Sequence, residues 1–390
     1  MADIPSGGAY ASPFKIGSGS LDASGLSAGR TYNLPDASGT LALDDSPGYA
    51  DYAMNILMNP FRHIPRNAAR NTLQGYATGG YAPACWFLQH DAAGSGVQVR
   101  VWNAKDSSPP ISFTGLGCPD YLELKNNTAG PVGVLLCQPI ESAGPAGLSS
   151  VSLQSKDVRF QMTAAASSGS PTLKSQMFSW TGTPDAAGAR NLVASWVAHA
   201  PTFNTTTLTA LGVGTASLST SFALAVDQSL SPTPSTCVNL TCAVWVEGLA
   251  SGASLYLAKP YLARGTAAPT VWQPHPAADA LLRRYCAWSF SGVDAGAGSA
   301  PGTPSCSMYY CHPTASFASS VQFGMLMRTA PTVTLYDGAG NSGKVSYNDG
   351  TWKNNGAVAL QTGFPAGLIV QSTVTGATFT NFDWLATAEI

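Results

Sequence analysis

A glycine-rich stretch near the C-terminal end has the spacing of a phosphate-binding loop. Residues 338–344 read Gly-Ala-Gly-Asn-Ser-Gly-Lys and follow an alternating, strand-like run at 332–336. A phosphate-binding loop also needs Ser or Thr after the lysine, and a helix whose N-terminal amides face the phosphate. Position 345 is Val, and the run 345–348 continues as a strand. The sequence therefore predicts a hairpin loop here and no nucleotide site.

Residues able to perform hydrolysis are few and scattered. The five histidines, which are the usual general bases, are scattered at positions 63, 90, 199, 275 and 312. The glutamates that could form a catalytic carboxylate pair lie outside any glycosidase or lyase motif, at positions 123, 141, 247 and 389. We therefore predict a protein that is not an enzyme.

Two cysteine pairs invite comparison with zinc sites: Cys237 with Cys242, and Cys306 with Cys311, which precedes His312. Structural zinc usually binds cysteines two to four residues apart, with a second pair of ligands. In an alternating run, the separation of Cys237 and Cys242 places them on opposite faces of a strand. We expect no metal site, and we expect the eight cysteines to be mainly reduced and buried.

The composition indicates a turn-rich β protein with hydrophobic cores. Of 390 residues, 45% are hydrophobic and only 10% are charged, against roughly 25% in an average soluble domain. The formal net charge of −2 provides no basic field for phosphates, so nucleic acid is not expected as a partner. No run of eighteen apolar residues occurs, and the start lacks the regions of a signal peptide. We expect no membrane insertion, and synthesis in the cytoplasm of a host cell.

The first 48 residues are rich in Gly, Ser and Ala and contain no run long enough for a globular core. Within them, 31–34 and 40–43 alternate around the turn 35–39, which predicts two short strands. Such a hairpin is marginal on its own and needs neighbours. Apolar residues at helical spacing then predict a helix over 49–58, ended by Asn59-Pro60.

Between about 60 and 275 the pattern is strand after strand, and no long helix is indicated. Apolar and polar residues alternate in five runs, at 97–102, 150–154, 158–162, 237–246 and 254–258. These runs fit an antiparallel sandwich in which each sheet buries one face. The predicted class is all-β.

Several short segments of the sequence resemble segments of the fibre and appendage proteins of tailed bacteriophages. The run 30–43 resembles a segment near their N-termini, and 55–62 resembles the start of their jelly-roll domain. As a pattern, 158–162, 178–182 and 255–265 resemble jelly-roll carbohydrate-binding modules.

Three later phrases resemble the connector and the C-terminal domain of the same fibres, namely 273–286, 325–337 and 382–390. In the connector phrase Arg284 and Tyr285 are kept, whereas Leu282 and Arg283 replace a cysteine and a glutamine. The resemblance thus spans nearly the whole chain, with a diverged connector.

The resemblance implies a homotrimeric fibre. We predict a virion attachment segment, a short helical connector, an antiparallel jelly-roll sandwich, a second connector and a C-terminal β-sandwich-like tip domain. Their boundaries are 1–48, 49–62, 63–275, 276–286 and 287–390.

The implied function is adhesion of a virion, through a tail or capsid appendage, to a glycan or protein on the host surface. Other virion proteins would bind residues 1–48. One alternative is a purely structural component, such as a head fibre, collar or baseplate decoration; another is a glycan-degrading tailspike. Modules of this kind often hold a structural calcium, so a calcium ion stays an alternative, although no residue here is matched to such a site. No other cofactor is predicted. The sequence names neither the host nor the receptor.

Glycan binding by such folds relies on aromatic rings stacked on sugars and on amide side chains that bond the hydroxyls. The contexts of Trp86, Trp180, Trp245 and Trp272 are strand-like, so these rings are expected in the core. We expect exposed rings in two polar loops instead. The candidate glycan-binding residues are Trp102, Asn103, Tyr347, Trp352 and Asn354. For the last three, the alternative is a plain surface hairpin with Trp352 covering the core edge.

Overall fold

The computed structural model describes part of the chain, in two compact units, Met1–Tyr49 and Ala50–Ile390. The described residues are 14–16, 19–21, 55–57, 61, 73–82, 85–144, 149–206, 208–230, 232–266, 272, 282–289, 307–310, 317–339, 341–374, 377 and 379–388. In the first unit, β1 (Phe14–Ile16) pairs antiparallel with β2 (Gly19–Leu21). The strands predicted at 31–34 and 40–43 lie outside the described residues.

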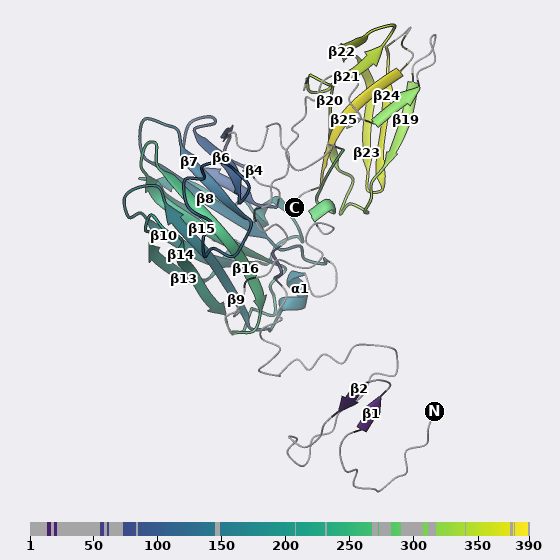
Figure 1. The fold of residues 1–390 in the computed structure, drawn as a ribbon. Coiled ribbons are helices and arrows are strands. Elements are labelled where there is room, and N and C mark those ends of the chain that lie inside the picture. The colour runs from purple at the N-terminus through teal and green to yellow at the C-terminus, as the bar shows by residue number, and fades with distance from the viewer. Residues whose placement is uncertain are drawn as a thin grey trace, which may run out of the picture. The chain divides into compact units, whose positions relative to one another are not determined.

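Residues 74–264 form an antiparallel β-sandwich (Figure 1). Sheet I has the order β13-β10-β15-β8-β5-β4. Its strands are β4 (Gly80–Tyr81), β5 (Phe87–His90), β8 (Val132–Pro139), β10 (Thr172–Trp180), β13 (Leu208–Ser217) and β15 (Asn239–Leu249).

Sheet II has the order β14-β9-β16-β7-β6-β3. Its strands are β3 (Gln74–Tyr76), β6 (Val97–Asn103), β7 (Asp120–Asn126), β9 (Val158–Ala166), β14 (Ala223–Leu230) and β16 (Ser254–Arg264). Successive strands cross between the sheets, from β8 to β9 to β10 and from β14 to β15 to β16, as in a jelly roll. The predicted all-β sandwich is confirmed for this part of the chain.

The core between the sheets is built from one face of each strand. In β6, for example, Val97, Val99 and Val101 are buried while Gln98 and Arg100 are half-buried on the outer face. β8 is buried on both faces because a further layer covers sheet I. That layer is the hairpin of β11 (Val193–Val197) and β12 (Ala200–Phe203), with the 3-10 turn Ala187–Ala189.

The predicted helix over 49–58 is wrong for its described residues, 55–57, which are not helical. Asn55 is 2% exposed and binds the bulged part of β16. Its Nδ2 donates to the Pro260 carbonyl at 2.7 Å, and its Oδ1 accepts from the Leu262 amide at 3.0 Å. The Ile56 amide also donates to the Leu262 carbonyl at 2.7 Å. Pairing with a strand has overridden the helical spacing, which also fits an apolar extended segment.

The strand predicted at 150–154 is also wrong, because Ser150–Leu153 form the short helix α1. The Ser149 side chain caps it by accepting from the Ser152 amide at 3.2 Å. The buried Ser150 hydroxyl then donates to the Ile140 carbonyl at 2.8 Å. The Ser149 cap and the hydrogen bond of the Ser150 hydroxyl favour a helical turn. The alternating pattern that suggested a strand is only five residues long and does not outweigh them.

The C-terminal strands form two further sheets around their own core. One is built on β25 (Phe379–Thr387), with β17 (Cys286–Trp288), β18 (Ser307–Tyr310), β20 (Thr332–Tyr336), β21 (Val345–Asn348) and β22 (Trp352–Gly356). The other has the order β19-β24-β23, from Phe317–Gln322, Gly367–Ser372 and Val358–Phe364. Val333, Leu335, Leu368, Val370 and Phe382 are among the buried residues between them.

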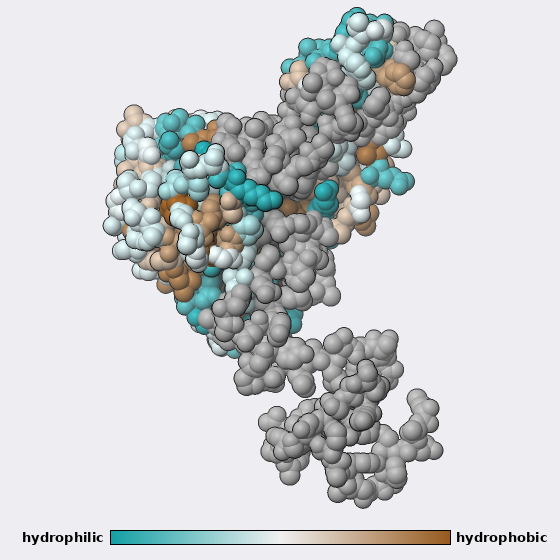
Figure 2. Space-filling view, in the orientation of Figure 1, coloured by the Kyte–Doolittle hydropathy of each residue, from teal (hydrophilic) through white to brown (hydrophobic). Residues whose placement is uncertain are grey.

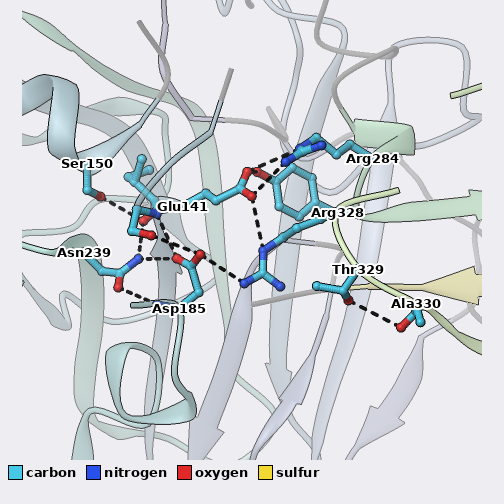
Figure 3. A network of polar contacts seen from close by, with 11 residues as sticks. Glu141, Ser150, Asp185, Asn239, Arg284, Arg328, Thr329 and Ala330 are labelled. Carbon is cyan, nitrogen blue, oxygen red and sulfur yellow. Dashed lines mark hydrogen bonds and ion pairs between the residues drawn. The ribbon is translucent and has the colours of Figure 1, made fainter. Parts of the chain in front are cut away.

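A buried carboxylate joins the sandwich to the segment that follows it. Glu141, 5% exposed on the side chain, faces Arg284 at 3.0 Å and Arg328 at 3.4 Å (Figure 3). Arg328 also contacts Asp185 at 3.1 Å. Leu282 and Tyr285 extend the sandwich core nearby. The kept arginine and tyrosine of the connector phrase therefore have a structural role.

Candidate functional site

Two aromatic side chains and an amide form a row across three strands of the C-terminal sheet. Asn348 on β21 lies opposite Trp352 on β22 and opposite Phe379 on β25. Residues opposite each other in an antiparallel pair share one face. The two rings therefore flank Asn348, with their strands about 10 Å apart, since adjacent strands are about 4.8 Å apart. We call Trp352, Asn348, Phe379 and Asn354 the C-terminal row.

The row is open to solvent. Phe379 is 38% exposed, and Trp352, Asn348 and Asn354 are half-buried. A half-exposed ring backed by a sheet is held in place while one side stays accessible. This is the arrangement that stacking on the apolar face of a sugar ring requires.

The two amides of the row are oriented by their own oxygen atoms. Asn348 Oδ1 accepts from the Gly350 amide at 2.9 Å. Asn354 Oδ1 accepts from the Ser346 hydroxyl at 2.7 Å, and that hydroxyl accepts from the Gly338 amide at 2.7 Å. Among the described residues neither NH₂ group has an acceptor, so each can donate to a ligand oxygen.

The predicted companion Tyr347 lies on the opposite face of this hairpin. It precedes Asn348 on the same strand, and successive side chains of a strand point to opposite faces. Its partners are Lys353, whose ammonium is 6.0 Å from the ring centroid, and the buried Thr380 across the ladder. Tyr347 is thus separated from Trp352 and Asn354, although the sequence places all three within eight residues.

The glycine-rich loop beside the row is organised by the fully buried carboxylate of Asp337. Asp337 Oδ1 accepts from the amides of Ala339 and Asn341, both at 2.9 Å. Its Oδ2 accepts from Asn341 Nδ2 and from the Asn355 amide, both at 2.8 Å. Burial opposes ionisation, but these hydrogen bonds hold the pKa of Asp337 below its usual value. Gly343 and Ser342 pair back onto the end of β20 and close the loop. It does not join a hairpin, because β20 and β21 both pair antiparallel with β25 and so run in the same direction.

The expected exposure of Trp102 is wrong. Trp102 is 6% exposed, and its Nε1 donates to Glu123 Oε2 at 2.7 Å. Residues 104–119 fold back over this part of sheet II, where Ile111 hydrogen-bonds the Tyr121 hydroxyl and Phe113 stacks on the Tyr121 ring. The loop that was expected to present Trp102 therefore covers it.

Asn103 organises the turn that follows β6. Its Nδ2 donates to Asp120 Oδ1 at 2.6 Å, and its Oδ1 accepts from the Lys105 amide at 2.9 Å. Its own amide donates to Asp106 Oδ2 at 2.7 Å. These bonds engage the side chain within the protein, as in an Asx turn.

The other tryptophans behave largely as predicted. Trp86, Trp180 and Trp245 are 0%, 8% and 4% exposed, which confirms their place in the core. Trp272 is half-buried and packs against the Trp102 cluster, with its Nε1 donating to the Pro260 carbonyl at 3.1 Å.

The outer face of sheet I is covered by the β11–β12 hairpin. Phe203 packs at a tilt against Phe178 and edge-to-face against Trp245, with ring centroids 4.7 and 5.2 Å apart. Gln89 on β5 accepts from the Leu192 amide at 3.0 Å, and His199 contacts Asp91 at 2.6 Å. The residues of β5, β10 and β15 on this face are therefore covered by the protein's own chain, whereas the edge strand β13 of the same sheet is largely exposed.

Within the described ranges, no group of three or more His, Cys, Asp or Glu side chains is placed to hold a metal ion. Six described cysteines are buried and outside any disulfide, at 85, 118, 137, 237, 242 and 286. Burial raises the pKa of Cys118 to about 11, so this thiol is protonated and unreactive at neutral pH. Cys237 precedes β15, and both it and Cys242 contact the inter-sheet core, which corrects the expectation of opposite faces.

No helix in the described part of the chain is long and apolar enough to span a membrane. The visible surface of the described sandwich is mostly pale, with separate brown and teal groups (Figure 2). A surface of mostly intermediate hydropathy agrees with the 10% charged residues of the whole chain.

Comparisons with known proteins give structural likenesses only. No protein-family model matches the chain, and no curated protein matches it. Among solved structures, a CBM61 module in complex with β-1,4-galactotriose is 14% identical, with a TM-score of 0.27 over 51% of this chain and 99% of that one.

A xylan-binding CBM22 domain is 11% identical, with a TM-score of 0.26 over 52% of this chain and 99% of that one. The tailspike protein 4 enzymatic domain of bacteriophage CBA120 is 12% identical, with a TM-score of 0.27 over 47% of this chain and 20% of that one. At these identities and scores, the likenesses carry no argument about ligand or activity.

Proposed function

We propose that the chain is a non-enzymatic fibre protein of a bacteriophage virion that adheres to a glycan on the host surface. The observation that carries the proposal is the C-terminal row, in which Trp352 and Phe379 flank Asn348 on one open face. Two rings and the NH₂ groups of Asn348 and Asn354 supply the stacking and hydrogen bonding that a sugar needs. The phrases shared with phage fibres motivate the virion context.

We further propose a homotrimer attached to the virion through residues 1–48. A single exposed row of this size supports a weak contact, and three linked copies raise avidity through effective concentration. The full chain has a mass of 40.2 kDa, so the trimer is expected at about 120 kDa. A monomeric mass in light scattering at micromolar concentration would contradict this assembly.

The proposal is tested by binding of the full chain to a panel of extracted bacterial surface polysaccharides. Trp352→Ala and Phe379→Ala are each expected to weaken binding at least tenfold, because truncating an aromatic anchor removes its contact area. Lys353→Ala is the matched control, since Lys353 lies on the same hairpin but faces the other side. It should bind like the wild type.

Two results favour the alternatives. A folded chain that binds no polysaccharide in the panel and no intact bacterium of the correct host would favour a structural virion component. Shortening of the polysaccharide chains during incubation would favour a glycan-degrading tailspike.

A further inference from the structure

The guanidinium of Arg100 is stacked on the Trp102 ring, with its Cζ 3.3 Å from the ring centroid. Both residues lie on the outer face of β6, two positions apart. A guanidinium lying flat on an indole gains a cation–π contact and keeps its donors at its edge. The Trp102 ring, predicted from the sequence as a sugar platform, is thus occupied by a cation.

Arg100 makes no salt bridge in the described part of the chain, although its charge contacts the Trp102 ring. Its Nε is buried and lacks a hydrogen-bond acceptor. Burial lowers the pKa of Arg100, against the attraction of Glu123 and Asp106. A cation desolvated in this way is stabilised by an added anion.

The carboxylate nearest in register is already engaged. Glu123 lies directly opposite Arg100 on β7 and is 5% exposed. Its Oε2 accepts from Trp102 Nε1 at 2.7 Å and its Oε1 from the Ser254 hydroxyl at 2.7 Å. Asp106, the other acidic neighbour, accepts from the Asn103 amide at 2.7 Å. Glu123 orients the platform under Arg100, and its two oxygens accept from Trp102 and Ser254 rather than from the guanidinium.

A second cation lies diagonally across from Arg100. Lys125 follows Glu123 by two residues, so it is on the same outer face, and it pairs in register with Gln98. Diagonal neighbours of this kind are roughly 7–8 Å apart. Lys125, Gln98 and Arg100 are all half-buried rather than covered. On the same sandwich, by contrast, Arg159 and Lys174 are paired with Asp227 and Glu247 at 2.7 Å.

We propose that Arg100 and Lys125 form a subsite for a sugar carboxylate, such as a hexuronate unit of an acidic polysaccharide. A guanidinium fork matches the two oxygens of a carboxylate, and a lysine adds a point charge. Gln98, opposite Lys125 and two residues before Arg100, offers an amide to a neighbouring hydroxyl. The subsite deepens the proposed glycan adhesion, on which it rests for the class of ligand. It lies on sheet II and shares no residue with the C-terminal row.

The test is calorimetric titration of the full chain with a galacturonate trimer, its carboxyl-reduced neutral form, and inorganic sulfate. The acidic trimer is expected to bind, the neutral trimer at least tenfold more weakly, and sulfate weakly. Affinity for the acidic trimer should also fall with added salt. Equal binding of the acidic and neutral trimers overturns the proposal. Sulfate that competes as well as the trimer overturns it too, since the site would then be a general anion site.

Variants separate the subsite from a change in folding. Arg100→Gln is expected to lower the affinity for the acidic trimer at least tenfold. Arg100→Lys is expected to lower it nearly as much, because lysine keeps the charge but lacks the two parallel N–H donors of a guanidinium. Lys125→Gln should lose severalfold. Lys174→Gln is the control, with the same change of charge on the paired lysine of sheet I. Near-ultraviolet circular dichroism checks that Trp102 keeps its surroundings, and unchanged affinity in a folded Arg100→Gln variant overturns the proposal.

The same preparation distinguishes failure of the subsite from failure of the adhesion function. If Trp352→Ala loses polysaccharide binding while folded Arg100→Gln keeps it for acidic and neutral chains alike, the subsite is refuted and adhesion stands. If the galacturonate trimer binds through Arg100 but the chain binds no bacterial polysaccharide, the subsite stands and adhesion fails.

Discussion

The Tyr285 hydroxyl donates a 2.6 Å hydrogen bond to Glu141 Oε2, which ties the connector to the end of the sandwich. Both side chains are almost fully buried, and Arg284 approaches the other oxygen, Oε1, at 3.0 Å. Burial and the neighbouring Glu141 raise the pKa of Tyr285, so it stays a donor at all relevant pH values. The buried charge of Glu141 is stable here because donors from two separate segments surround it.

Tyr285→Phe is therefore expected to destabilise the protein by about 1.5–3 kcal/mol, the usual contribution of a hydrogen bond to a charged group. The ring still packs on the core, so only the hydroxyl is lost. The measurement is urea unfolding followed by tryptophan fluorescence. Tyr347→Phe is the control, since the described residues supply no partner for its hydroxyl, and a loss of equal size there would contradict the argument.

Asp185 is expected to stabilise the fold at neutral pH and to lose this stabilisation in acid. Burial opposes its ionisation, but hydrogen bonds from Asn239, Ser142 and Arg328 hold its pKa below the usual 3.8. When the pKa of a carboxyl group is lower in the folded than in the unfolded protein, the ionised group stabilises the fold. This stabilisation is complete above the pKa of the unfolded state and is lost as the pH falls through the pKa of the folded state. The difference in Tm between wild type and Asp185→Asn should be largest above about pH 5 and should shrink below about pH 4. A difference that is constant from pH 6 to pH 2 would contradict the assignment.

Gly133 fixes the distance between β8 and the hairpin that covers it. A Cβ at this position would lie 2.3 Å from the His199 carbonyl oxygen and 2.5 Å from the Trp196 ring. Gly133→Ala should therefore push the β11–β12 hairpin off sheet I and destabilise the protein by about 1–3 kcal/mol. A red shift of tryptophan emission would report the exposure of Trp196. Gly130→Ala is the matched control, because a Cβ there meets no atom within 4 Å.

The strand pattern of the sandwich was predictable because its period is strictly local. The runs at 97–102, 158–162, 237–246 and 254–258 lie largely within β6, β9, β15 and β16. Alternation specifies which residues share a face, but it does not show what covers the outer face. Trp102 is buried because residues 104–119 fold back over sheet II. This is a tertiary contact, which the local alternation of residues does not indicate.

Only part of the C-terminal row was predictable, because strand pairing brings the other part from a distant segment. A loop rich in Trp and Asn marked Trp352 and Asn354, but strand alternation already separates Tyr347 from them. Phe379 joins the row from a strand 27 residues further along, through the pairing of β21 with β25. Arg100 carried no sequence signal beyond its i, i+2 spacing to Trp102. Its contact with that ring, and the lack of an acceptor for its Nε among the described residues, are properties of the fold.

Asp337→Asn is expected to weaken the loop beside the row and the row itself. The carboxylate accepts four hydrogen bonds, and an amide can replace only one of its oxygens as an acceptor. Loss of the contacts at one oxygen should cost about 3 kcal/mol. The released Asn355 amide loosens β22, so glycan affinity should fall together with Tm.

Asp349→Asn provides the control for this prediction. Asp349 lies in the same hairpin and pairs with Lys353 at 2.8 Å, but it is exposed. Exposed pairs contribute little because solvent screens them, so this variant should match the wild type in Tm and in binding. If Asp337→Asn keeps full glycan affinity despite a lowered Tm, the row does not depend on the loop, and binding has to be sought elsewhere on the sheet.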